Sequence, residues 1–104
     1  MAWVYLIVAG VLEVVWAFAM KQSDGFTRPA ASAVTLTAMI ASFALLALAM
    51  KSLPLGTAYA IWTGIGALGA FVLGVVLLGE SASALRVGSA ALIVAGLIGL
   101  KVSG

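Results

Sequence analysis

The sequence contains no cysteine and no histidine, and only 8% of its 104 residues are charged. It therefore has no thiol nucleophile, no disulfide framework, no imidazole proton relay and no Cys/His metal site, and we expect no cofactor. A water-soluble fold of this size needs roughly a quarter charged residues to cover its surface. A soluble globular protein is excluded, and the function is expected to take place inside a membrane.

What the sequence does contain is apolar: 65% of the residues are hydrophobic, and the mean hydropathy is +1.32. A helix needs about 20 residues to cross the hydrocarbon core, so four spans use about 80 positions and leave only short turns. The predicted spans cover about residues 3–20, 30–50, 54–78 and 84–101. The fold class expected is therefore all-α, a single four-helix transmembrane domain over residues 1–104. The first span has no basic segment before it and no A-x-A-like cleavage site, so we expect it to remain as a membrane helix rather than act as a signal peptide.

The positive charges are scattered and nearly balanced across the membrane. The cations are Lys21, Arg28, Lys51, Arg86 and Lys101. No two are adjacent, so no nucleic-acid partner is expected. Three fall on the side of the first and third turns, and two fall on the opposite side with the N-terminal amine. Because positive loops set orientation, this near-balance predicts insertion both ways and an antiparallel assembly of identical chains.

The fourth span carries small residues at a spacing of three or four. They are Gly88, Ala91, Ala95 and Gly99. Helices in lipid associate through small residues that let their backbones approach, and four helices can hardly enclose a solute pathway alone. The stripe is the predicted seam of a homodimer, although small residues are common in any membrane helix.

Glu13 is the only acidic residue away from a span end. It lies about 15 Å along the first helix, near the bilayer centre. A charge there costs roughly 2.5 to 3.5 kcal/mol to insert, so an intramembrane acid is by default a functional site. We interpret Glu13 as a group that exchanges a proton for a cation. The alternative is a protonated carboxyl that holds two helices together by a hydrogen bond.

Aromatic residues are placed to surround this carboxyl. Trp16 follows Glu13 by three residues and Gly10 precedes it by three, which predicts an aromatic plane and an open notch on one face. Tyr59 and Trp62 share a face of the third span, with Trp62 at a depth within about two turns of Glu13. Tyr59 taken alone could equally belong to the aromatic belt at the membrane surface.

The second span offers Ser42, with Met39 on the same face. A serine in a helix often bonds only to its own backbone, and that alternative stays open here. Together, a carboxylate, aromatic faces and a hydroxyl describe a site for a small organic cation, whereas an anion would find no partner.

Residues 64–69 read Gly-Ile-Gly-Ala-Leu-Gly and match the dinucleotide fingerprint G-x-G-x-x-G letter for letter. No strand precedes them and they lie inside an apolar span, so the nucleotide reading fails. Glycine weakens a helix by about 1 kcal/mol, which makes Gly64 and Gly66 a candidate hinge. Close packing without motion is the alternative.

Three motifs carry a resemblance to a known family. They are G-x-x-E-V-x-W-A at residues 10–17, K-x-S-x-G-F at 21–26 and P-x-G-T-A-Y-A-I-W-T-G-I-G-A-x-G at 54–69, followed by G-L-I-G-L-K at 96–101. The chain resembles the small multidrug resistance family over essentially its whole length, and more narrowly the guanidinium-exporter subtype. Trp16 is the feature that separates this subtype from relatives that export bulky quaternary ammonium compounds.

The resemblance implies a multi-pass protein of the bacterial inner membrane. It implies an antiparallel, dual-topology homodimer that exports guanidinium in exchange for protons by alternating access. Glu13 is then the shared carboxylate for proton and substrate, with Trp16, Ser42, Tyr59 and Trp62 as its partners in the site.

Two other functions remain open from the sequence. One is a broad-specificity exporter of quaternary ammonium and other drug cations, which tetraalkylammonium transport would reveal. The other is a structural membrane subunit that transports nothing, in which Glu13 only joins helices. An enzyme is not expected, because one carboxylate without a base, thiol or metal supports little chemistry.

Overall fold

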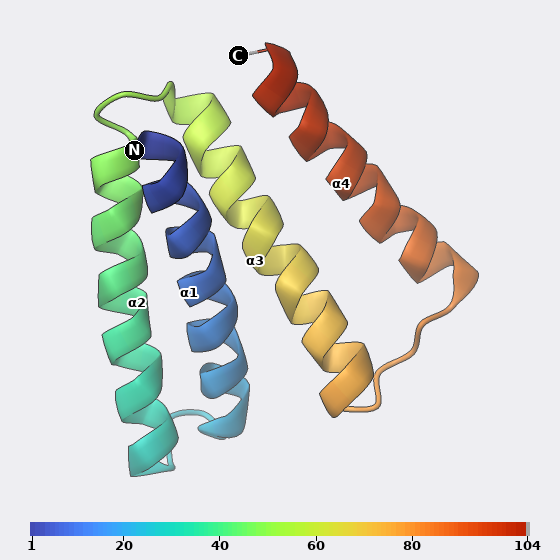
Figure 1. The fold of residues 1–104 in the computed structure, drawn as a ribbon. Coiled ribbons are helices and arrows are strands. Elements are labelled where there is room, and N and C mark those ends of the chain that lie inside the picture. Colours follow the sequence, from blue (N-terminus) through green and yellow to red (C-terminus); the bar gives the residue numbers. More distant parts are fainter. Residues whose placement is uncertain (104) are drawn as a thin grey trace.

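The computed structural model describes residues 1–103 as four helices, which confirms the expected all-α fold (Figure 1). The helices are α1 (Ala2–Gln22), α2 (Pro29–Ala49), α3 (Leu55–Leu77) and α4 (Ala84–Ser103). Each begins and ends within two residues of its expected span, and each is long and apolar enough to cross a membrane. The hydropathy pattern locates these helices because membrane spans are defined by their own length and composition.

The turns explain where the helices stop. Pro29 opens α2 and Pro54 caps α3, positions at which the missing N–H of proline costs nothing. Between α1 and α2, Asp24, Gly25 and Phe26 all have positive φ angles, which reverse the chain within a few residues. The buried Ser23 hydroxyl ties this turn together by accepting a hydrogen bond from the backbone N–H of Phe26 at 3.1 Å.

Helix α1 lies between α2 and α3 and packs against both (Figure 1). The buried core gathers where α1 and α3 begin and α2 ends. Its members are Leu6, Ala9, Leu46, Ala49, Ala58, Ile61 and Trp62. Both turns on the opposite side, α1–α2 and α3–α4, fall at the same end of the bundle in Figure 1. The three-helix unit α1–α3 is therefore the scaffold on which the candidate site is built.

Helix α4 stands apart from this unit. Within residues 1–103 its backbone comes close to α3 alone, and none of its residues is buried. Its one reach to α1 is at the end of the helix, where the Lys101 ammonium lies 5.1 Å from the ring centre of Trp3. Leu97 packs on Gly64 of α3, and Arg86 lies 4.9 Å from the ring centre of Phe71 while pairing with Glu80 at 3.5 Å. An apolar groove of about 600 Å³ lies along α3, with Ile93 and Leu97 of α4 on its other side.

The small residues of the predicted seam lie on the surface of α4. All four members of the predicted seam are exposed: Gly88, Ala91, Ala95 and Gly99. A Cβ atom built on Gly88 or Gly99 would meet nothing within 4 Å. The stripe is thus a bare surface on this chain, and its role as a dimer seam stays a prediction.

Candidate cation site

Glu13 and Trp16 lie one helical turn apart on α1, and both are half-buried. Glu13 Oε1 and Trp16 Nε1 are fully buried atoms with no hydrogen-bond partner in residues 1–103. An unpaired polar atom in an apolar interior costs about 1 to 3 kcal/mol. A carboxyl oxygen and an indole N–H therefore both lack a partner at this point of the bundle.

Glu13 also forms no salt bridge within residues 1–103. The ion pair between Arg86 and Glu80 is the one salt bridge that the structure contains across residues 1–103, and it lies at the α3–α4 turn. A carboxylate removed from water without a partner is strongly disfavoured. The buried Glu13 oxygen therefore has neither a hydrogen-bond donor nor a cation beside it within residues 1–103.

Ser42 connects all three helices one turn before Glu13 on α1. Its fully buried hydroxyl donates to the carbonyl oxygen of Ala9 on α1 at 2.6 Å and accepts from Trp62 Nε1 on α3 at 3.0 Å. The Ala9 carbonyl is the one that helical geometry pairs with the backbone N–H of Glu13. The possibility that Ser42 bonds only to its own helix is therefore wrong, because the close approach of α1 offers its hydroxyl a better-placed partner.

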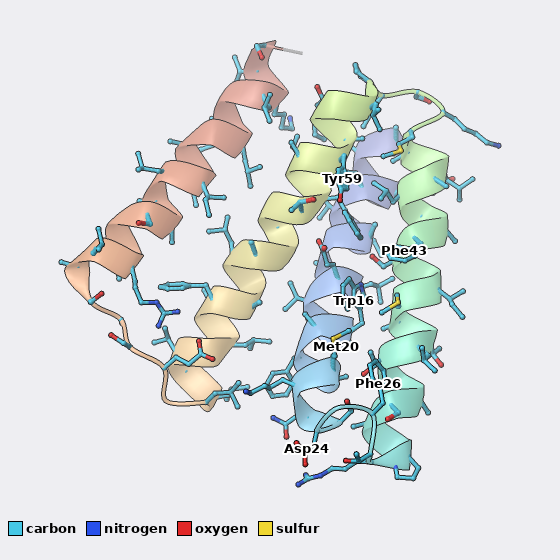
Figure 2. All side chains as sticks on the ribbon, turned by 180° about the vertical axis from the view of Figure 1, so that it is seen from behind. Trp16, Met20, Asp24, Phe26, Phe43 and Tyr59 are labelled. Carbon is cyan, nitrogen blue, oxygen red and sulfur yellow. The ribbon has the colours of Figure 1, made fainter. Side chains whose placement is uncertain are left out.

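Four aromatic rings form a continuous row across the three helices. The ring centres of Trp16 and Phe43 are 6.3 Å apart, those of Phe43 and Trp62 are 5.6 Å apart, and Tyr59 stacks on Trp62 at 5.6 Å with an interplanar angle of 29°. Figure 2 shows Trp16, Phe43 and Tyr59 along one face of the bundle. Trp62 is only 6% exposed, whereas Tyr59 is 50% exposed and Phe43 48% exposed. Trp62 therefore forms the buried side of the row, and Phe43 and Tyr59 form its exposed rim.

Phe43 is the member of this row that the sequence analysis missed. It touches both tryptophans and joins the α1 half of the row to the α3 half. A signal was present, because Met39 and Phe43 are four residues apart and share one face of α2. Met39 itself is half-buried, one turn away from Phe43.

Gly10 is not the open notch that its spacing predicted. A Cβ built there would lie 2.7 Å from Ile65 Cγ2, so the side chain of Ile65 already fills the space. The cause is the close approach of α1 and α3, which only glycine permits at this contact. Gly10 is therefore a packing position and does not line the row.

The glycines of α3 also meet neighbours closely. A Cβ on Gly64 would lie 2.6 Å from Leu97, and one on Gly66 would overlap Glu13. Helix α3 runs without interruption through both positions. Close packing thus describes how this structure uses Gly64 and Gly66, and bending at these residues stays a prediction.

Comparison with known proteins places this geometry in context. The family model described as Small Multidrug Resistance protein matches residues 1–93. The chain is 63% identical to the guanidinium exporter of Escherichia coli K12 over 103 residues, which cover 99% of this chain and 98% of that one. It is 62% identical to the guanidinium exporter of Yersinia pseudotuberculosis, with 99% of each chain covered, and 61% identical to that of Salmonella typhimurium, with 99% and 98% covered. This chain belongs to the Small Multidrug Resistance family.

Proposed function

We propose that this chain exports guanidinium across the bacterial inner membrane in exchange for protons. The observation that carries the proposal is the buried, unpaired Glu13 oxygen, one helical turn from the unpaired indole N–H of Trp16 at the end of the aromatic row. Guanidinium is a flat cation with paired N–H donors that match a carboxylate, and its face is attracted to indole rings. The guanidinium exporters named above, which share more than 60% of their residues with this chain, support the same substrate.

Exchange follows from giving one carboxyl two competing ligands. Glu13 must be ionised to bind guanidinium, and a proton neutralises it when no cation is bound. Occupation by one ligand therefore excludes the other. If the site opens alternately to each side of the membrane, inward movement of protons drives guanidinium outward. Gly64 and Gly66 are the candidate points at which α3 bends during this change.

A second copy of the chain is part of the proposal. The rim residues Phe43 and Tyr59 are about half exposed, so one chain forms only one wall of a site. Helix α4 has no buried residue and presents its small-residue stripe outward. Two copies inserted in opposite directions would pair these surfaces, and the nearly balanced cations of the turns allow both insertions. Such a dimer brings two Glu13 carboxyls to one substrate.

Uptake by proteoliposomes tests the proposal. Purified protein is reconstituted with a pH gradient across the vesicle membrane, and the flux of labelled guanidinium is measured with and without the gradient. We expect guanidinium flux that stops when the gradient is collapsed by a protonophore, and much slower flux of tetraethylammonium. Faster tetraethylammonium flux would assign the broad drug-cation function instead. A protein that moves neither cation would be a structural subunit.

A further inference from the structure

The Glu13 carboxyl occupies the space where a side chain on Gly66 would begin. Gly66 is buried in the α1–α3 interface. A Cβ built on it would lie 2.6 Å from Glu13 Cγ and closer still to the carboxyl carbon and Oε1. Real Cβ atoms essentially never come within 3.0 Å of another heavy atom. The carboxyl can hold this position only because residue 66 has no side chain.

The neighbouring contacts fix the carboxyl along the interface as well. On one side of Glu13, Ile65 fills the space over Gly10. On the other side, a Cβ on Gly69 would lie 2.9 Å from Val14 Cγ1 and closer to its Cγ2. The two helices therefore mesh through three successive glycine contacts, of which only the middle one holds a polar group. An apolar side chain displaced from its contact can repack, whereas a displaced carboxyl changes its distance to the aromatic row.

We propose that Gly66 is a positioning residue for the Glu13 carboxyl. Its missing side chain forms a seat on α3 that sets the depth and direction of the carboxyl relative to Trp16, and thereby the affinity for the cation. The inference rests on the proposed function for its binding readout. It differs from a hinge at Gly66, because a hinge acts through bending of α3 and does not depend on the length of the side chain at position 13.

A double-mutant cycle separates a seat from a hinge or from general packing. The variants are Gly66→Ala, Glu13→Asp and the pair together, made in the full chain, with guanidinium binding measured by calorimetry on the purified protein. Aspartate is one methylene shorter than glutamate and withdraws from the space of the new Cβ. We expect each single change to weaken binding by about tenfold or more, and the pair to bind at least about fivefold better than the product of the two losses.

Gly69→Ala is the matched control on the same helix face. Its overlap is with Val14, so Val14→Ala should restore its packing while Glu13→Asp should only add its own loss. If Gly66→Ala alone fails to fold, recovery of folded, binding protein in the pair with Glu13→Asp supports the seat equally. The proposal is wrong if the double variant binds guanidinium no better than the product of the two single losses predicts. It is also wrong if Gly66→Ala leaves the affinity unchanged.

A second measurement does not require guanidinium. The sequence has two glutamates, Glu13 and Glu80. A carboxyl ¹³C NMR signal can therefore be assigned to Glu13 with a Glu80→Gln variant. Gly66→Ala should move this signal more than Gly69→Ala does. If the wild-type chain binds no guanidinium and the signal still moves in this way, the proposed function fails and the seat stands. If the wild-type chain binds guanidinium but Gly66→Ala moves the signal no more than Gly69→Ala does, the seat fails and the proposed function stands.

Discussion

Replacing Ser42 by alanine tests the hydrogen-bonded link that joins the three scaffold helices. The Ser42 hydroxyl donates to the Ala9 carbonyl and accepts from Trp62 Nε1, and it is completely buried. The substitution removes both bonds. Ala9 keeps the backbone partner that an α-helix supplies, but the indole N–H of Trp62 is left in an apolar interior without an acceptor.

The expected loss of stability follows from that one orphaned donor. An unsatisfied buried donor costs about 1 to 3 kcal/mol, while side-chain hydrogen bonds between membrane helices contribute about 0.6 kcal/mol on average and about 1.7 kcal/mol at most. We therefore expect the free energy of unfolding of Ser42→Ala to fall by about 1 to 2 kcal/mol. Guanidinium affinity should fall as well, because Trp62 is no longer held at its present angle beneath Phe43 and Tyr59.

The assay is reversible unfolding in mixed micelles with increasing SDS, followed by circular dichroism. Ser32→Ala is the matched control, since the exposed Ser32 hydroxyl bonds only to the Arg28 carbonyl of the adjoining turn at 2.7 Å. It should change stability by less than about 0.5 kcal/mol. In a Trp62→Phe background, which has no indole N–H, Ser42→Ala should cost about 1 kcal/mol less than in the wild type. Equal costs in the two backgrounds, or equal effects of Ser42→Ala and Ser32→Ala, would refute the reasoning.

Three further predictions concern transport. Glu13→Gln should leave a folded protein that has lost proton-driven guanidinium flux, because the amide keeps the size of the side chain and loses its charge and its exchangeable proton; a variant that retains coupled flux in liposomes would contradict the mechanism. A tag at the C-terminus should be found on both sides of the membrane by protease or thiol-reagent accessibility. Two lysines added within the turn at residues 81–83 should force one orientation and lower the activity of that chain when it is expressed alone. Protons and guanidinium should compete, so the logarithm of the apparent affinity should rise with pH at a slope of about one to two while the Glu13 carboxyls are protonated, and should flatten once they are ionised. Calorimetry from about pH 5 to pH 9 measures this slope, and an affinity independent of pH would remove Glu13 as the shared site.

The sequence by itself determined the features that are local in the chain. Four apolar segments of helical length, broken by proline and turn residues, located α1 to α4 to within two residues. Glu13 stood out because a lone carboxyl within an apolar span is costly wherever its neighbours lie. The same is true of the aromatic spacing of Tyr59 and Trp62, which places both rings on one face of any helix that contains them.

Only the tertiary structure decided which faces of the helices meet. The rotation of α2 brings the Ser42 hydroxyl to the Ala9 carbonyl rather than to its own backbone, and it also brings Phe43 between the two tryptophans. Because α1 and α3 approach closely, the side chain of Ile65 occupies the space over Gly10, and the Glu13 carboxyl occupies the space over Gly66. In an apolar helix, hydrophobicity is nearly uniform around the axis, so the side that faces a neighbour carries almost no compositional signal. Contact between helices in lipid depends instead on shape and on single hydrogen bonds, and these exist only once the helices have come together.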